Sequence, residues 1–398
     1  MGGERIDPFA DSSQAVRCAP EIVRTANVVC TVADPVQDLS HALGDIDFEL
    51  VLLFVSPQAD IEHVAARSIE LFNDSLVLGC TTAGELNCDG YSDGSIVAVG
   101  FPRDQFRARM LQVDDLGDYD AQTLIDRMIQ GRNALMRDVP DWEYEFNFLM
   151  IDGLSRCEDR LTADLALGLG PVPLFGGSAG DGETFETTFL IANGKVLRNA
   201  AIVAQIRTIC PIKVFKSDHL VPTDQRMVVT GAFPEQRLVY EINAEPAARE
   251  YARVLGIDPE QLDTFTFAAH PVVVRIGDQH HVRSIQKVAD NGDLCFFSAI
   301  DEGLVLTLAE PLDMVGHLEQ EMQALSVGGA PDTILACDCL LRKVEAEQKQ
   351  LKGKISDVLA RNRVVGFSTY GEQLNSMHVN QTLTGVAIYP PAHSSKSG

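Results

Sequence analysis

Apolar residues along this chain gather in short, nearly continuous runs that recur with similar surroundings. The runs at residues 50–55, 147–151 and 333–336 are typical of strands buried within a sheet. Each run is followed by apolar residues at helical spacing, which are Ile61, Val64, Ala65, Ile69 and Phe72, then Leu161 and Leu165, and then Val344, Leu351, Ile355 and Val358. The pattern therefore predicts three strands, each followed by an amphipathic helix.

A short glycine-containing motif follows each of these helical segments. It reads GCTTAGE at residues 79–85, FGGSAGD at 175–181 and GFSTYGE at 366–372. Another strand-like run follows each motif, at residues 96–101, 200–206 and 383–389. The repeated unit therefore predicts strand, helix, strand, turn and strand. A strand–helix–strand crossover normally makes the two strands parallel.

Between the second and third units the pattern changes to shorter runs separated by hairpin-like turns. Residues 228–240 are typical of a hairpin and residues 244–255 of a short helix. Short strands are expected at residues 272–276, 282–288, 294–298 and 304–308. Together with the three units, this segment predicts an α/β fold with mixed β-sheets flanked by helices.

Charge and cysteine content narrow the classes of partner and the compartment. The chain has 32 basic and 57 acidic residues, a formal net charge of -25, which repels nucleic-acid phosphates and anionic membrane surfaces. Its longest apolar runs are too short to cross a bilayer, and its first ten residues do not resemble a secretory signal. The nine cysteines show no C-x-x-C spacing, which favours free thiols in a reducing cytoplasm.

One motif suggests an enzyme. Residues 176–180 form G-x-S-x-G, the pattern of a hydrolase nucleophile elbow, with Ser178 at its centre. An elbow requires a helix directly after the serine, whereas a strand-like segment follows here. The motif is also explained as the second copy of the repeat, so we expect no catalytic serine and no enzyme.

The glycine-acid turns allow two interpretations. Their hydroxyl and acidic side chains could line one ligand pocket at the carboxyl ends of strands, with Thr81, Thr82, Glu85, Ser368, Thr369 and Glu372 as the candidates. Alternatively the turns are structural. Gly84, Gly180 and Gly371 would then supply positive φ, and the acids would cap backbone amides.

Several stretches resemble one family of sensory proteins. GCTTAGEL with GYSDGSIVAVGF is similar to the N-terminal FIST domain, and GFSTYGEQ with MHVNQTLTGVAIY to the C-terminal FIST domain. YEINAEPAAREYARVLG and HPVVVRIG resemble the start of the C-terminal domain. The likeness implies two FIST domains, at residues 41–230 and 231–390, with an N-terminal extension at 1–40 and a disordered tail at 391–398. FIST domains bind small ligands in signal transduction.

Within the family, the chain looks most like the haem-binding nitric-oxide sensors called NosP. YGEQ and HVNQT, at residues 370–373 and 378–382, and PTDQRMVVT at 222–230 carry this likeness. The resemblance implies haem b with nitric oxide or another diatomic gas as the signal. It also implies output to a separate histidine kinase or cyclic-di-GMP enzyme. A homodimer is compatible with the sequence.

Haem requires an axial ligand to its iron and cations or donors for its propionates. His219 lies in the loop-forming segment KSDHLVPTDQR, and His378 lies in NSMHVNQT beside the third turn. The resemblance makes both candidate iron ligands, with Arg226 and Tyr370 as further haem contacts. The structural alternative is that either imidazole only ties down backbone.

The second functional hypothesis keeps the fold and changes the ligand. A haem-free FIST module would bind an amino acid or a similar small metabolite. The acids and hydroxyls of the three turns would suit an ammonium-bearing ligand.

Overall fold

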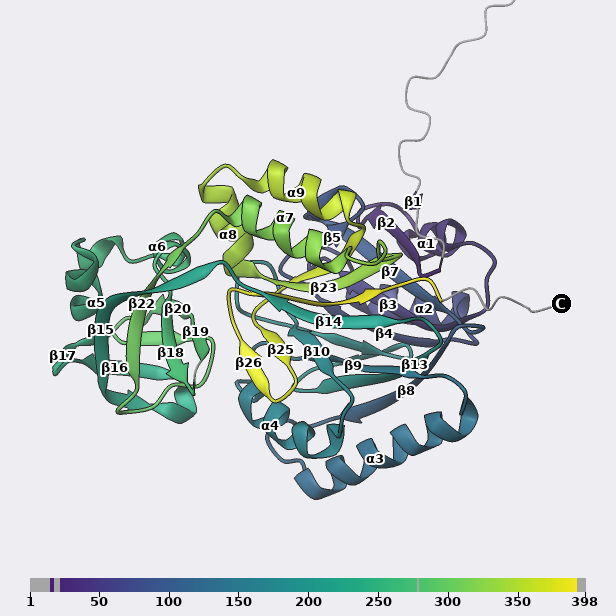
Figure 1. The fold of residues 1–398 in the computed structure, drawn as a ribbon, viewed down its shortest axis with the longest axis horizontal. Helices are drawn as coiled ribbons and strands as arrows, with labels where there is room; N and C mark the ends of the chain where they lie inside the picture. Colours follow the sequence, from purple (N-terminus) through teal and green to yellow (C-terminus); the bar gives the residue numbers. More distant parts are fainter. Residues whose placement is uncertain (1–14, 18–21, 278, 392–398) are drawn as a thin grey trace, which may run out of the picture.

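The computed structural model describes residues 15–17, 22–277 and 279–391. Within these ranges the chain forms three α/β units of the same element order and a β-rich domain inserted into the third unit (Figure 1). The predicted α/β class, with mixed sheets and flanking helices, is confirmed. Apart from residue 391, the predicted tail at 391–398 lies outside the described residues. No helix of the described ranges combines the length and apolar character needed to cross a membrane.

Each unit runs strand, helix, strand, helix, strand, hairpin and closing strand. The first contains β2 (Arg24–Val29), α1 (Pro35–Leu43), β3 (Phe48–Val55), α2 (Ile61–Leu71), β4 (Leu76–Thr81), β5 (Glu85–Asn87), β6 (Gly90–Ser92) and β7 (Ser95–Pro102). The second contains β8 (Phe106–Val113), α3 (Ala121–Asp138), β9 (Tyr144–Ile151), α4 (Glu158–Leu169), β10 (Leu174–Ser178), β11 (Leu190–Ala192), β12 (Lys195–Leu197) and β13 (Ala201–Thr208). The third contains β14 (Ile212–Ser217), α7 (Met314–Leu325), β23 (Thr333–Cys339), α8 (Leu340–Gln348), α9 (Lys352–Arg361), β24 (Val364–Thr369), β25 (Glu372–Leu374), β26 (Met377–Val379) and β27 (Leu383–Ile388).

The pairing inside each unit follows the prediction. The two strands joined by the crossover helix are parallel in every case, namely β3 with β4, β9 with β10, and β23 with β24. The closing strand returns antiparallel to the first of them, as β7 does to β3, β13 to β9 and β27 to β23.

Aspartate caps mark the starts of several helices, because Asp60 accepts from the His63 amide and Asp120 from the Thr123 amide.

The hairpin that follows each turn leaves its own unit. Strand β5 of the first unit pairs with β24 of the third, β25 of the third pairs with β10 of the second, and β11 of the second pairs with β4 of the first. Each unit therefore gives its hairpin to one of the other two units and receives a hairpin from the remaining one. Each of the three sheets has the same strand order and ends in a hairpin borrowed from another unit.

One apolar core joins the three sheets. Phe54 of β3 stacks on Phe367 of β24, with ring centroids 4.7 Å apart, and meets Phe148 of β9 edge-on at 6.2 Å. The helices cover the outer faces of the sheets (Figure 1), where α1 and α2, α3 and α4, and α7 and α9 each bury a separate apolar cluster. The units thus share one interior and cannot be separated without exposing it.

The insertion leaves the body between β14 and α7 and lies to one side of the three sheets (Figure 1). It has its own sheet and core, built from β15 (Leu220–Phe233), β16 (Leu238–Ile242), β17 (Glu245–Pro246), α5 (Ala247–Leu255), α6 (Thr264–Ala269), β18 (Val272–Ile276), β19 (Gln279–Arg283), β20 (Ile285–Val288), β21 (Leu294–Phe296) and β22 (Val305–Pro311). At the neck of the insertion the Leu312 amide donates to the His219 carbonyl (2.7 Å). Residue 230, expected at a domain boundary, lies inside β15.

We predict that Phe54→Ala lowers the free energy of unfolding by about 3–5 kcal/mol, because the cavity opens where all three sheets meet. Chemical denaturation followed by circular dichroism measures the change. The control is Leu167→Ala, at a side chain that is 73% exposed, which should change stability by less than about 0.5 kcal/mol. Similar small losses for both variants would contradict a core shared by the units.

Candidate functional site

The hairpin exchange brings the three glycine-acid turns together. The Ala83 amide of the first turn donates to the Ser368 carbonyl of the third (2.9 Å). The Ser178 amide of the second donates to the Gly371 carbonyl (2.9 Å), and the Gly180 amide donates to the Thr81 carbonyl (3.1 Å). Turns that are far apart in the sequence therefore form one hub, held by backbone hydrogen bonds.

The acids of the first and third turns are tied to their own units. Glu85 accepts from the Thr82 hydroxyl (2.6 Å) and from the Ser95 amide (3.0 Å) and hydroxyl (2.9 Å). Glu372 accepts in the same way from Thr369 and from Thr382. Burial raises the pKa of Glu85 to about 7 and that of Glu372 to about 8.

The predicted glycine conformations are only partly correct. Gly84 has a φ of 129°, as expected, but Gly180 and Gly371 do not have positive φ. Crowding explains these two positions, because a Cβ at Gly180 would lie 2.8 Å from the Ala83 nitrogen. A Cβ at Gly371 would lie 2.3 Å from Cε1 of His378.

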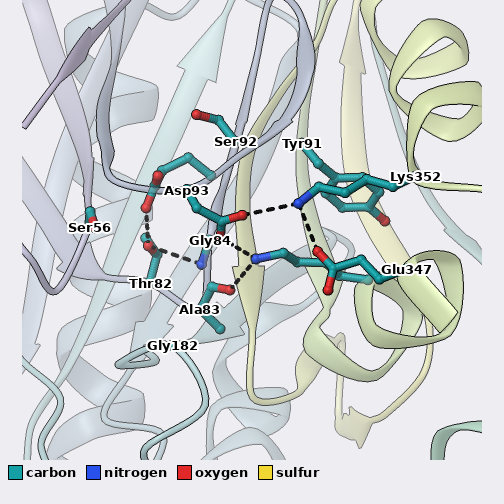
Figure 2. Close-up of polar contacts among 12 residues, drawn as sticks. Ser56, Thr82, Ala83, Gly84, Tyr91, Ser92, Asp93, Gly182, Glu347 and Lys352 are labelled. Atoms are coloured by element: carbon teal, nitrogen blue, oxygen red, sulfur yellow. Dashed lines mark hydrogen bonds and ion pairs between the residues drawn. The ribbon is translucent and has the colours of Figure 1, made fainter. Parts of the chain in front are cut away.

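Charged side chains surround the first turn and bond to one another. Figure 2 shows Thr82, Ala83 and Gly84 beside Asp93, which contacts Lys352 (3.1 Å), itself bonded to Glu347 (2.7 Å). The buried ammonium of Lys343 donates to the Ala83 carbonyl (3.2 Å) and to Asp93. The six predicted pocket residues (Thr81, Thr82, Glu85, Ser368, Thr369 and Glu372) are all buried in this hub, and among their side-chain oxygens only that of Ser368 lacks a partner within the described residues.

His219 is buried at the neck of the insertion. Its Nε2 donates to Glu345 (2.9 Å) and its Nδ1 accepts from Arg342 (2.8 Å), so both ring nitrogens are used. Arg342 in turn donates to Asp338 (2.7 Å). Burial lowers the pKa of His219, which keeps the imidazole neutral in this network.

The two other predicted haem contacts lie in different surroundings. Arg226 is exposed on β15 of the insertion. Tyr370 is buried at the hub, where its hydroxyl donates to Asp181 and accepts from the Asp181 amide (3.0 Å). Its ring lies 4.6 Å from that of Phe185 and 6.2 Å from that of Phe297, a residue of the insertion.

His378 is buried on β26, and one of its nitrogens lacks a partner. Gln373 Nε2 donates to His378 Nδ1 (3.1 Å) and also contacts the Gly371 carbonyl (3.3 Å) and Ser178 Oγ (2.9 Å). The carbonyl fixes the amide orientation, so Nδ1 is an acceptor and Nε2 carries the proton. Burial lowers the pKa of His378, with the charge of Arg283 acting in the same direction.

Buried polar atoms without partners gather around His378, where the third unit meets the insertion. We call them the interface cluster; within the described residues they are Gln373 Oε1, His378 Nε2, Asn380 Oδ1 and Nδ2, Gln381 Oε1, Arg283 Nε, Ser284 Oγ and Ser298 Oγ. An unsatisfied buried polar group costs about 1–3 kcal/mol. Ordered water, an ion or a bound polar molecule would satisfy such groups.

Contacts between the insertion and the body bring the two sides of the interface cluster together. Gln381 Nε2 donates to the Ala268 carbonyl of α6 (2.9 Å). Ser298 lies between Phe297, which packs near Tyr370, and Ala299, whose amide donates to Asp159 of α4 (3.0 Å). The Ser284 carbonyl accepts from the Phe297 amide (2.9 Å). The cluster therefore bridges the insertion and the body.

The two histidines predicted as iron ligands differ in how far their ring nitrogens are occupied. An iron ligand must present an unprotonated ring nitrogen beside a wide apolar slot. Both nitrogens of His219 are occupied, whereas His378 Nε2 has no partner within the described residues and would bind iron only with its proton moved to Nδ1 and the Gln373 amide turned over. The described residues also contain no group of three or more His, Cys, Asp or Glu placed to hold a metal.

Six of the seven residues of the interface cluster were missed by sequence reasoning, including Gln373 of the YGEQ motif. Asn380 and Gln381 stand in the HVNQT segment that carried the family likeness, so their motif was a signal although their role was not. Arg283, Ser284 and Ser298 lie in short strands and turns without any distinguishing pattern. These residues come close together only because the insertion packs against the third unit.

Comparison with known proteins identifies the class and then the family. The model of the FIST N domain matches residues 49–245, and that of the FIST C domain matches residues 247–375. FIST domains are small-ligand sensory modules of signalling proteins and not catalytic ones. The chain belongs to the FIST family and contains both of its domains.

One relative is similar in sequence over most of the chain. It is the uncharacterized protein MJ1623 of Methanocaldococcus jannaschii, which is 22% identical over 356 residues. The match covers 78% of this chain and 67% of the relative. The junction between the two family models falls at residue 246, inside the inserted domain.

We predict that Glu85→Gln with Glu372→Gln flattens the dependence of stability on pH. Both carboxyls have raised pKa values in the folded state, so they stabilise the fold when protonated. That contribution is full below the unfolded pKa and is lost as pH rises through about 7 and 8. The free energy of unfolding should therefore fall between about pH 5 and pH 8 in the native chain, and less so in the variant.

Denaturant titrations at several pH values measure this slope. The control is Glu62→Gln with Glu143→Gln, at two exposed carboxyls, which should keep the native slope. An unchanged slope in the Glu85 and Glu372 variant would show that the two acids are not protonated in the folded chain.

Proposed function

We propose that this chain is a haem-free sensory module that binds a small polar metabolite at the interface cluster. The observation that carries the proposal is the set of buried, unpartnered polar atoms shared by the third unit and the insertion. Their grouping at one boundary supports a bound molecule better than it supports eight separate packing defects.

The chemistry of the cluster suggests the class of ligand. Donors are supplied by His378 Nε2, Asn380 Nδ2 and Arg283 Nε, which suit a carboxylate or carbonyl. Acceptors are supplied by Asn380 Oδ1, Gln373 Oε1 and Gln381 Oε1, which suit an ammonium or hydroxyl group. An amino acid or a similar small metabolite carries both kinds of group.

A ligand at this boundary has a direct route to a signal. It would contact Arg283 on the insertion and Asn380 on the body at once, and so favour one position of the insertion over others. A cytoplasmic partner, such as a histidine kinase or a cyclic-di-GMP enzyme, would read that position in trans. The partner, the compartment and any homodimer come from the family resemblance and the cysteine content.

Haem b with nitric oxide as the sensed gas is the alternative, and it rests on the resemblance to the NosP sensors. An absorption spectrum of protein produced with a haem precursor tests it. The metabolite proposal expects no Soret band. A Soret band that shifts with nitric oxide and disappears in His378→Ala would overturn the haem-free proposal.

We predict that an amino acid or related metabolite raises the thermal stability of the native chain and does not do so in Asn380→Leu. A ligand at 100 times its Kd stabilises the folded state by about 2.7 kcal/mol. Asn380→Leu also removes two unpartnered buried atoms, so the free variant should be at least as stable as the native chain. Differential scanning fluorimetry against a panel of amino acids and related acids and amines measures both effects.

The matched control is Thr25→Val, because the Thr25 hydroxyl is also buried and unpartnered but lies on β2, away from the interface cluster. This variant should keep the full ligand response. A response that survives Asn380→Leu, or that Thr25→Val removes equally, would place the ligand elsewhere.

A further inference from the structure

A cleft of about 290 Å³ separates the second unit from the insertion. It is distinct from the interface cluster, although Gly153 on its wall backs onto Tyr370 and Ser178. Its lining combines cations with aromatic rings and includes Arg156, Phe185, Arg237, Lys287, Phe296 and Phe297.

Three of these residues have a backbone conformation that side chains rarely adopt. The φ angles are 60° at Arg156, 56° at Phe185 and 52° at Arg237. They belong to three separate segments of the chain, two in the second unit and one in the insertion. Left-handed conformations of bulky residues persist only where the surroundings enforce them, and they are common at ligand sites.

Buried carboxylates enforce this conformation. Asp181 accepts from the Phe185 amide (2.8 Å) and holds the loop that carries the ring. Asp152 accepts from the Leu154 amide (3.0 Å) and anchors the loop that ends at Arg156. The guanidinium of Arg237 donates to Glu158 (2.7 Å), which fixes the insertion against α4.

The charged side chains that line the cleft are three cations, Arg156, Arg237 and Lys287, and one carboxylate, Glu186. Arg237 is neutralised by Glu158 and by Asp159 (2.9 Å). Within the described residues, neither Arg156 nor Lys287 has a carboxylate at ion-pair distance. With Arg237 neutralised, Arg156 of the second unit and Lys287 of the insertion still outnumber Glu186, so the cleft favours an anion in a chain of net charge -25.

The aromatic rings supply an apolar surface beside these cations. The rings of Phe185 and Phe297 are 5.6 Å apart, and the ring of Tyr370 lies behind Phe185. Phe185 is half-buried and supplies most of the accessible ring surface, and the almost fully buried Phe296 and Phe297 support it. Ring faces of this kind pack against planar apolar groups.

We propose that this cleft is a second binding site, which takes an anion with a planar apolar body, such as an aryl carboxylate or an aryl phosphate. The anionic group lies between Arg156 and Lys287, and the planar body lies against Phe185 and Phe297. The site bridges the second unit and the insertion, so its occupancy favours the docked position of the insertion. It does not depend on a metabolite at the interface cluster.

Binding of benzoate, phenyl phosphate and the neutral isostere benzamide to the full chain, measured by isothermal titration calorimetry, tests the proposal. At least one of the two anions should bind, with benzamide at least tenfold weaker. The tighter anion identifies whether the site prefers a carboxylate or a phosphate. Arg156→Gln with Lys287→Gln should weaken the anion at least tenfold and leave benzamide unchanged.

The matched control is Lys195→Gln with Arg249→Gln, which removes the same charge at two exposed positions outside the cleft. It should keep anion binding within twofold. Asn380→Leu should also keep it, which separates this site from the interface cluster. Failure of both anions to bind, or equal weakening by the two double variants, would overturn the proposal.

Discussion

The exchange of hairpins among the three units is the constraint on which the rest of the structure depends. Each sheet is completed by strands from another unit, so no unit has a finished sheet of its own. The same exchange carries the glycine-acid turns to one hub, where their backbones bond to each other. The turns therefore hold the body together. The carboxylates of Glu85 and Glu372 already accept hydrogen bonds within it.

The insertion adds a second core to this body and forms a boundary with it, where we place the two proposed ligand sites. It is connected through a single neck, where His219 links the strand entering the insertion to the charged side chains of α8. Beyond the neck, the insertion meets the body through a buried polar surface at Asn380 and through a cleft with cations at Arg156 and Lys287. Both of the proposed ligand sites lie at this boundary.

Local patterns in the sequence were sufficient for the repeated units but not for their assembly. Apolar runs and helical spacing predicted the strands, the crossover helices and the parallel pairs, because these depend on residues close in the chain. The hairpin exchange pairs β5 with β24, about 280 residues later, and no local pattern encodes such a partner. For the same reason His219 and His378 looked alike in the sequence, although the fold satisfies both nitrogens of one and leaves one nitrogen of the other without a partner.

The central claim is that the interface cluster holds a small polar molecule. A high-resolution crystal structure of the protein purified directly from cells tests it most directly. The account predicts density for a non-protein molecule within hydrogen-bond distance of the Asn380 amide and His378 Nε2. Pairing of these groups with protein atoms, or contact with ordered water alone, would contradict it.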